Sequence, residues 1–350
     1  MLNLTLEYAT ADATDRSVQR SDAAALIAAG YEGIPTPAQV WGTPEVDDDI
    51  KFFANFGKQL SDTVEMYGYG NYNNKTATGG FYYRNPTNRG GVYGDGDTLL
   101  IGDLTPGDAD VCPVVNVNGV TPDPVAFAQV QANPNCFSFQ ETIPGGFTPS
   151  FGGELTDTAL LFGLKGDISE DLSWDVSGYY GHNEADFFIN NTVNASMGPN
   201  SPRNFNPGAY EQEDFNLSAD FVYIASEQLG IAFGAEYREE QFTIVPGQEE
   251  SYIDGGLGTQ GFSTSTNGFP GFSPEISGSW DRNNYAFYVD AEYDATEDLL
   301  LTAAVRFEDF NDFGSTTNYK LGANLSISEG FGLRGTFSTG FKAPTPGQSN

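Results

Sequence analysis

Residues 285–307 have the sequence YAFYVDAEYDATEDLLLTAAVRF, and this stretch decides the fold. Apolar residues alternate with polar or small residues on both sides of the central segment 294–298, DATED. Alternation with a period of two gives each strand one apolar face and one polar face. The few turn-forming residues between the two runs permit only a tight connection. The stretch therefore predicts an antiparallel β-hairpin with two long strands.

Comparable short polar turns recur along the chain, each between two alternating runs. They lie at 60–63, 168–172, 225–229, 295–299 and 327–330. About eleven strands are predicted in this way, over residues 1–9, 49–59, 63–74, 154–167, 172–185, 213–224, 229–242, 283–294, 298–311, 316–327 and 331–342. Many of them exceed the roughly 5–6 residues typical of globular proteins and match the roughly 9–11 that cross a bilayer at a tilt.

The other connections are mostly long. Segments 10–48, 75–153, 186–212 and 243–282 are polar and rich in Gly, Pro, Asn and Asp, and only 312–315 is short. Tight turns at one end and long loops at the other are typical of outer-membrane barrels, in which the long loops lie outside the cell. The sequence thus predicts an all-β, transmembrane, antiparallel up-and-down β-barrel in the bacterial outer membrane. Aromatic residues near the strand tips fit the two interface girdles: Tyr8, Trp174, Tyr223, Tyr237, Tyr293 and Phe307.

Composition narrows the function classes. A formal net charge of −33 argues against nucleic-acid binding, because phosphate recognition needs an excess of Lys and Arg. The mean hydropathy is −0.35, and no apolar stretch approaches the roughly 20 residues of a membrane helix. A barrel escapes such a scan because only alternate residues face lipid. The alternative is a soluble β-sandwich whose apolar faces meet in a core; strand length and the loop asymmetry favour the barrel.

An odd number of strands indicates an incomplete barrel. With eleven strands, both the first and the last run outward, whereas bacterial single-chain barrels have an even number. The N-terminal residues also lack the pattern of a signal peptide, which an outer-membrane protein needs. We therefore expect residues 1–350 to be a partial barrel domain whose true start lies upstream.

The C-terminal stretch 333–344, LRGTFSTGFKAP, resembles a barrel segment of TonB-dependent receptors. In that family a strand commonly closes with a Gly-Phe-Arg-Ala-Pro-like run. Here the run is Gly340, Phe341, Lys342, Ala343 and Pro344, with Lys where Arg is more usual. The resemblance implies a 22-stranded barrel, of which this chain would be about half, with the plug domain, the TonB box and the C-terminal strands lying outside it.

The resemblance also implies active uptake. Such a receptor binds a scarce nutrient of the siderophore, carbohydrate or cobalamin type and imports it with energy delivered by TonB. The expected partners are outer-membrane lipid, TonB (through the plug region) and the small-molecule nutrient, and no cofactor is expected. Two alternatives stay open: a passive outer-membrane porin, and a β-rich surface adhesin.

Candidate binding residues fall into two sets. Alternation places one set of charged side chains on the inward faces, since a charge facing lipid would cost a few kcal/mol. These lumen-facing candidates are Glu236, Arg238, Asp290, Glu292, Arg306, Lys320 and Arg334. Cross-strand ion pairs and contacts to a plug are the favoured explanation of these charges, ahead of contacts to a ligand. Ligand contacts are expected from aromatic loop residues, namely Tyr82, Tyr83, Phe269 and Trp280.

The remaining chemistry-bearing residues are few. Cys112 and Cys136 lie in one long, exported loop, and this predicts a disulfide between them. Acidic runs such as 47–49 do not match the spacing of a calcium loop, so we interpret them as solvated loops and expect no metal site. His182 has no second His and no nucleophile beside it. The sequence therefore predicts a non-enzymatic protein.

Overall fold

Long strands in chain order dominate the computed structural model, which describes residues 1–109 and 111–349. A single antiparallel sheet has the order β1-β2-β3-β8-β9-β10-β11-β12-β13-β14-β15. Its strands are β1 (Leu2–Ala11), β2 (Glu45–Gln59), β3 (Val64–Gly80), β8 (Ser150–Ser169), β9 (Leu172–Asn190), β10 (Asn204–Ser226), β11 (Leu229–Pro246), β12 (Gly278–Thr296), β13 (Leu299–Phe310), β14 (Gly314–Ser328) and β15 (Phe331–Ser338). The predicted up-and-down order of eleven strands is confirmed. The sheet is open, with β1 and β15 as its edges.

Several strands are longer than predicted, and the extra residues lie at the ends that join the long connections. β10 begins at Asn204 rather than at residue 213, and β8 begins at Ser150 rather than at 154. Phe151, Phe187 and Tyr210 lie in these extensions on the face that is polar elsewhere. Alternation is lost there, so the hydrophobic period could not show that the strands continue.

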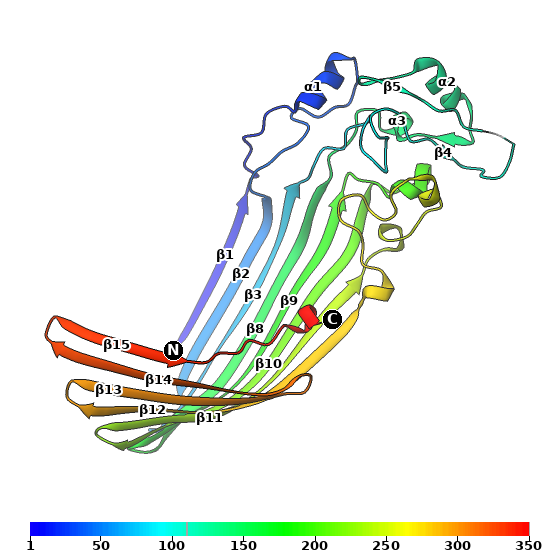
Figure 1. Cartoon of the computed structure of the whole chain (residues 1–350). Helices are drawn as coiled ribbons and strands as arrows, with labels where there is room; N and C mark the ends of the chain where they lie inside the picture. Colours follow the sequence, from blue (N-terminus) through cyan, green and yellow to red (C-terminus); the bar gives the residue numbers. More distant parts are fainter. Residues whose placement is uncertain (110, 350) are drawn as a thin grey trace.

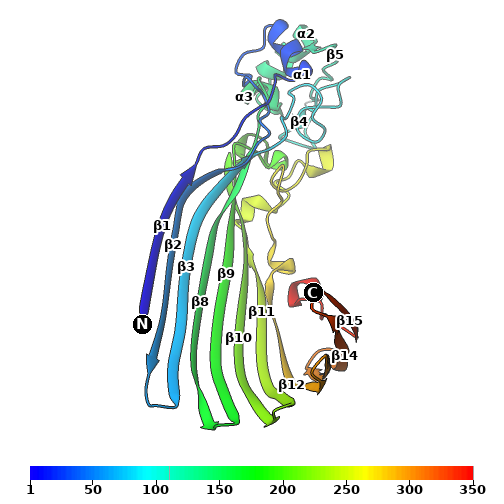
Figure 2. The same cartoon turned by 90° about the vertical axis from the view of Figure 1, so that its left-hand side faces the viewer.

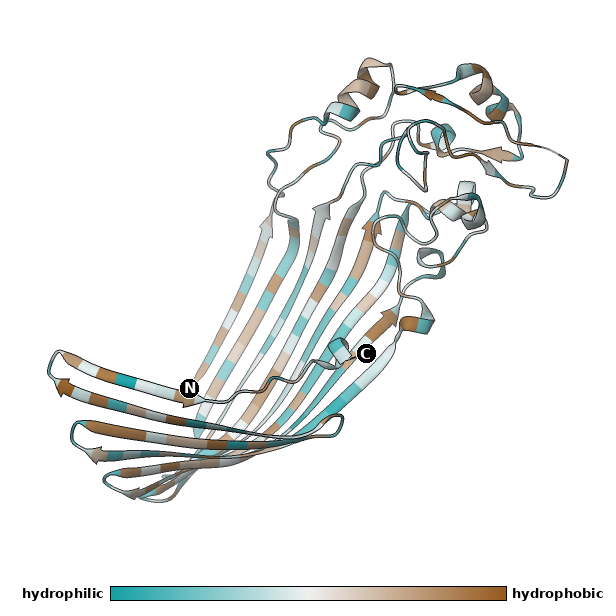
Figure 3. Cartoon of the chain, viewed as in Figure 1, coloured by the Kyte–Doolittle hydropathy of each residue, from teal (hydrophilic) through white to brown (hydrophobic). Residues whose placement is uncertain are grey.

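The register gives the sheet two chemically different faces. Phe287 is opposite Phe307, and Val289 is opposite Val305 on one face, while Tyr288 is opposite Arg306 on the other. The apolar side chains stay well exposed to the surroundings, as Phe287 (56%) and Leu321 (57%) illustrate. Figure 3 shows the resulting alternation of hydrophobic and hydrophilic bands along the strands. The predicted girdle aromatics all fall on this apolar face, the surface that a membrane barrel presents to lipid.

The sheet is bent into a trough, with tight turns at one end and the long connections at the other (Figures 1 and 2). We call the segments 12–44, 81–149, 191–203 and 247–277 together the cap. The cap contains α1 (Ser21–Ala28), α2 (Pro124–Ala132), α3 (Phe139–Thr142), the short strands β4 (Gly102–Asp103), β5 (Val117–Asn118), β6 (Thr121–Pro122) and β7 (Cys136–Phe137), and 3-10 helices at Ala195–Asn200, Glu249–Ser251, Gly258–Gln260 and Pro274–Ile276. A last short helix, α4 (Pro346–Ser349), contacts β11 and β12.

The cap has hydrophobic cores of its own, although the sequence predicts these segments only as long polar connections. The largest core joins three of the four segments: Val92, Tyr93, Phe137, Phe139, Phe147, Val193, Ala195, Leu257 and Phe262. A second core packs Ala23 and Leu26 of α1 against Tyr83. Its residues come from distant parts of the chain, so no local periodicity reveals it. Within the described residues, none of the helices has the length and apolarity required to traverse a bilayer.

Candidate functional site at the mouth of the trough

The concave face of the sheet carries the charged side chains that alternation assigned to the lumen. Glu236 is opposite Ala286, and Arg238 is opposite Asn284 on β12. Asp290 and Glu292 follow on the same face, opposite Ala304 and Thr302. The register also puts Arg306, Lys320 and Arg334 on this face. All seven predicted residues therefore share one face, opposite to the apolar one.

Three of the seven take part in ion pairs that cross the strands. Arg238 Nη2 lies 2.7 Å from Asp214 Oδ2 on β10 and 3.0 Å from Glu240 Oε1. Arg306 Nη2 lies 3.4 Å from Glu236 Oε2 and 3.1 Å from Glu308 Oε1. Within the described residues, Asp290, Glu292, Lys320 and Arg334 have no such ion pair. These four charges are left to contact water or another molecule in the lumen.

Arg282 extends the upper ion-pair group, and the sequence analysis did not single it out. Its side chain is 4% exposed, pairs with Glu240, and lies 3.8 Å from Asp312 Oδ2. The guanidinium carbon also lies 5.6 Å from the ring centres of both Phe310 and Phe313. A buried arginine with two carboxylates and two rings holds β11, β12 and the 311–313 connection in one arrangement.

A line of aromatic rings crosses the cap end of the concave face. We call it the aromatic rail. Phe269 from the cap lies 4.6 Å from the Phe151 ring and 5.3 Å from the Phe187 ring. Phe272 stacks on Tyr210 at 4.8 Å. The members of the rail are Trp41, Phe81, Tyr82, Phe151, Phe187, Tyr210, Phe242, Phe269 and Phe272. Trp280 continues it, since it pairs with Phe242 across the strands.

The four predicted ligand-contact residues differ in exposure and in position: three lie on or next to the rail, and one is buried in a cap core. Tyr82 is 57% exposed and packs edge-on against Trp41 at 5.0 Å. Phe269 and Trp280 are half-buried at the rail. Tyr83 is 6% exposed, lies in the α1 core, and donates a hydrogen bond to the Gly145 carbonyl at 2.6 Å. The expectation for Tyr83 needs correction: adjacent side chains point to opposite sides of an extended segment, so Tyr82 faces outward and Tyr83 faces the core.

Arg84 positions the start of the rail. Its Nε donates to Asn267 Oδ1 at 2.6 Å, its Nη1 donates to the Tyr82 carbonyl at 3.0 Å, and its guanidinium carbon lies 5.5 Å from the Phe81 ring centre. Burial, with Arg89 nearby, lowers the pKa of Arg84 to about 10, so it stays charged at neutral pH. The bonds fasten the two segments that carry Tyr82 and Phe269 to each other.

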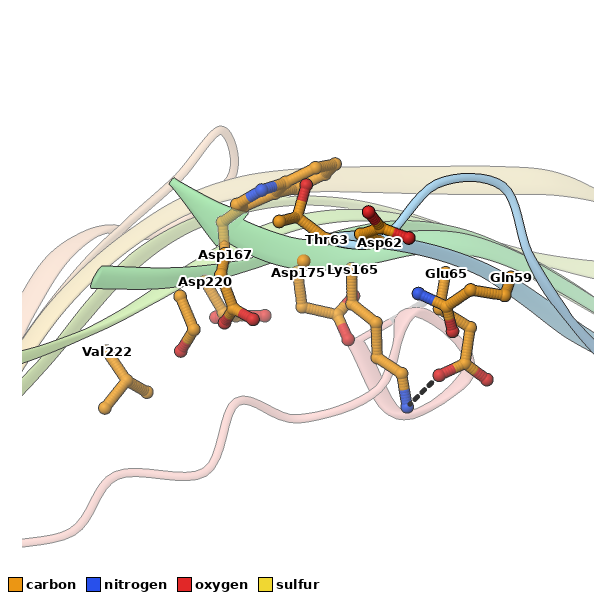
Figure 4. A pocket seen from close by; sticks show the side chains of 12 residues that line it. Gln59, Asp62, Thr63, Glu65, Lys165, Asp167, Asp175, Asp220 and Val222 are labelled. Carbon is orange, nitrogen blue, oxygen red and sulfur yellow. Dashed lines mark ion pairs between the residues drawn. The ribbon is translucent and has the colours of Figure 1, made fainter. Parts of the chain in front are cut away.

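A hollow lies at the turn end of the concave face (Figure 4). Its volume is about 370 Å³, and its lining includes five carboxylates and one cation: Asp62, Glu65, Asp167, Asp175, Asp220 and Lys165. Lys165 Nζ lies 3.6 Å from Glu65 Oε2 and 5.4 Å from the Tyr67 ring centre. The Tyr67 hydroxyl donates to Asp175 at 2.6 Å. This end of the trough therefore carries a negative field that attracts cationic groups.

The two sequence features outside the sheet have defined places. Cys112 and Cys136 form a disulfide with an S–S distance of 2.07 Å, at the edge of a small core that contains Val115 and Val130. The run 340–344 follows β15, and the Arg282 guanidinium donates to the Pro344 carbonyl. Phe341 packs on Phe313 at 5.5 Å. The run therefore contacts the same arginine and rings that join β11, β12 and the 311–313 connection.

Sequence reasoning missed the strand-borne part of the rail. Phe151, Phe187, Tyr210 and Phe242 lie at inward positions of their strands, where a polar residue is expected. An aromatic residue at an inward position next to a long connection was the available signal.

Comparison with known proteins shows a match of residues 116–350 to the family described as TonB dependent receptor-like, beta-barrel. Among solved structures, a variant of the ferric enterobactin receptor PfeA from Pseudomonas aeruginosa, in complex with enterobactin, is 11% identical with a TM-score of 0.54, over 99% of this chain and 40% of that chain. Another complex of that receptor gives 12% identity and a TM-score of 0.50, over 99% and 40%. The siderophore receptor PirA from Pseudomonas aeruginosa is 14% identical with a TM-score of 0.42, over 88% of this chain and 44% of that chain. The chain spans less than half the length of each.

Proposed function

From the premise that this chain belongs to the TonB-dependent receptor-like β-barrel family, we propose that the protein imports a scarce nutrient across the outer membrane with TonB-coupled energy. The chain is a segment of an outer-membrane β-barrel. Its role is that of a receptor and transporter rather than an enzyme. The proposed ligand is a small molecule of the siderophore, carbohydrate or cobalamin type.

The main support for the proposal is that the sheet has one apolar and one charged face and that a folded cap lies over its end. The convex face carries a broad apolar band, and the concave face is charged and ends in the aromatic rail beneath the folded cap. A sheet that only formed a passive pore would not need a cap with three packed cores over its mouth. The cap supports a binding role at the outside, upstream of a polar route along the trough.

The proposed ligand contacts are Tyr82, Phe269 and Trp280 on or next to the rail. Amphipathic aromatic side chains supply flat apolar contact area together with polar edges, and they suit sugars, chelates and corrin-type rings alike. PfeA is crystallised with enterobactin, which makes an iron chelate the first ligand to test. Exposure ranks Tyr82 first among the contacts, because its ring is the most accessible of the three.

The proposed contact with TonB runs through a plug that lies inside the barrel. The unpaired lumen charges of Asp290, Glu292, Lys320 and Arg334 fit a role in holding such a plug. The acidic hollow around Lys165 at the turn end fits basic side chains of the plug on the periplasmic side.

Uptake by the full-length protein tests the proposal. Cells that carry or lack the gene are supplied with a labelled ferric siderophore, labelled oligosaccharide or labelled cobalamin, with and without a protonophore. We expect gene-dependent uptake of one ligand class that stops when the proton-motive force collapses. Tyr82→Ala and Trp280→Ala should raise the KM, while the control Phe233→Ala, on the apolar face, should not. Gene-dependent uptake whose rate is unchanged by the protonophore would instead indicate a passive porin.

A further inference from the structure

A hollow of about 660 Å³ interrupts the apolar convex face. Its floor is made of small residues on three strands: Ala54 on β2, Gly70 on β3 and Gly178 on β9. The register brings Ala54 opposite Gly70, and Gly70 opposite Leu160 of β8. The walls are large apolar side chains: Phe52, Phe56, Tyr72, Leu160, Phe162, Tyr180 and Phe215.

The small size of Ala54, Gly70 and Gly178 creates the depression. A Cβ on Gly70 would lie 2.8 Å from Leu160 Cδ2, so the glycine allows the leucine to lie across the strand. Six of the seven wall side chains remain exposed, from 38% for Tyr180 to 58% for Leu160, and Phe56 is half-buried. No other described side chain fills the space between them, and apart from Thr158 the side chains of this face that border the hollow are apolar or aromatic.

The hollow lies in the outer half of the apolar band. Closer to the cap, the same face becomes polar. The next residue on this face beyond Tyr180 is His182 on β9, and the next beyond Phe215 is Glu213 on β10; these two polar residues are opposite each other. The Tyr180 hydroxyl donates to Glu213 Oε1 at 2.7 Å. On the turn side, Val176 and Trp174 continue the apolar band on β9. A tyrosine bonded to a carboxylate marks the level of the outer headgroups.

We propose that this hollow binds one acyl chain of a lipid in the outer leaflet. The convex face is the lipid-facing surface of an outer-membrane barrel, so the occupant comes from the bilayer. Water is a poor occupant, because it needs several polar partners and the floor and walls offer few. In lipid, association depends on close packing rather than on escape from water. A depression bordered by seven large side chains gives an acyl chain more contact atoms than a flat stripe does.

Photolabelling of the full-length protein in phosphatidylcholine vesicles tests this. The vesicles contain a trace of phosphatidylcholine with a diazirine either near the glycerol end or near the methyl end of one acyl chain. Peptides containing 68–72, 158–162 and 178–180 should capture at least about threefold more label than the flat stripe 285–289 and 301–307, which has similar exposure. The glycerol-end probe should favour Tyr180 and Tyr72, and the methyl-end probe should favour Phe56 and Phe162.

Variants separate a built site from general lipid contact. Ala54→Phe fills the floor and should abolish the excess labelling. Gly178→Leu is a second filling variant, because a Cβ there would lie 3.3 Å from the flexible end of Leu217 and 4.0 Å from the Asn216 carbonyl oxygen. Ala235→Phe, a matched change on the same face but outside the hollow, should leave the labelling unchanged. Equal labelling of the hollow and the flat stripe in the unaltered protein would overturn the proposal. So would a reversed order of the two probes, which would place the lipid in the inner leaflet.

Discussion

Phe269 fastens the cap segment 247–277 to the barrel wall, and its removal should loosen that segment alone. The ring contacts Phe151 at 4.6 Å, Phe187 at 5.3 Å and Phe272 at 5.8 Å. Truncating a fully buried phenylalanine to alanine costs about 3–5 kcal/mol. Because Phe269 is half-buried, we expect about 2 kcal/mol for Phe269→Ala. At 1.4 kcal/mol per factor of ten, the segment should open about 30-fold more often.

Hydrogen exchange of the segment's own amides measures this opening. The Asn267 amide donates to the Val193 carbonyl at 2.8 Å, the Gly271 amide to Ser251 at 3.0 Å, and the Phe272 amide to Pro207 at 2.9 Å. In Phe269→Ala these three amides should exchange about 30-fold faster, while amides of β10 and β11 should not change.

Phe233→Ala is the matched control. Phe233 stacks on Phe221 at 5.2 Å on the convex face, and its ring is paired with none of the described aromatic residues of the cap. Its truncation should leave the three reporter amides unchanged. Unaltered exchange in Phe269→Ala would refute the idea that the rail fastens the cap, and equal acceleration in both variants would show a global loss of stability instead.

Three further perturbations probe the two faces and the cap. Val289→Arg puts a charge on the lipid face and should destabilise the folded protein by about 2–4 kcal/mol. Asp290→Arg faces the lumen and should change the stability by less than about 1 kcal/mol. Urea titration of folding into vesicles measures both changes. Replacing Cys112 and Cys136 by Ser should destabilise the cap by about 2–4 kcal/mol, seen as faster proteolysis within 97–137, with unchanged heat-modifiable migration of the barrel. Arg282→Met should lower the free energy of unfolding by about 3 kcal/mol. This is the low end for a broken buried ion pair, because Glu240 keeps its pair with Arg238. Adding Glu240→Gln should restore part of the lost resistance to urea.

The sheet was predictable because its determinants are local. Period-two alternation in 285–307 and the recurrent tight turns specify both the strands and their order, and the register then follows from keeping Phe287 and Val289 on one face. The seven lumen-facing charges followed from the same alternation. Charge and face together were sufficient for them, because a membrane sheet penalises a charge on its lipid side.

The cap and the rail were not predictable in the same way. The cap cores join Tyr83 to α1 and Phe262 to Phe139, contacts between segments that are far apart in the chain. Phe151 and Phe187 occupy inward positions that the alternation rule assigns to polar residues, so their stacking with Phe269 depends on where a cap loop folds back. Tyr82 and Tyr83 show the limit most clearly, since two adjacent tyrosines have opposite roles.

Thiol labelling along β12 in intact outer membranes tests the central claim that the convex face lies in lipid and the concave face lines the lumen. The two cysteines within residues 1–350 form a disulfide, and any cysteine outside this range is first replaced by serine, so that each introduced cysteine reports alone. Single cysteines at 287, 289 and 291, and at 288, 290 and 292, are exposed to a membrane-impermeant, water-soluble maleimide. We expect the cysteines at positions 288, 290 and 292 to react and those at positions 287, 289 and 291 to be protected. Equal labelling of both sets would contradict this assignment of the two faces.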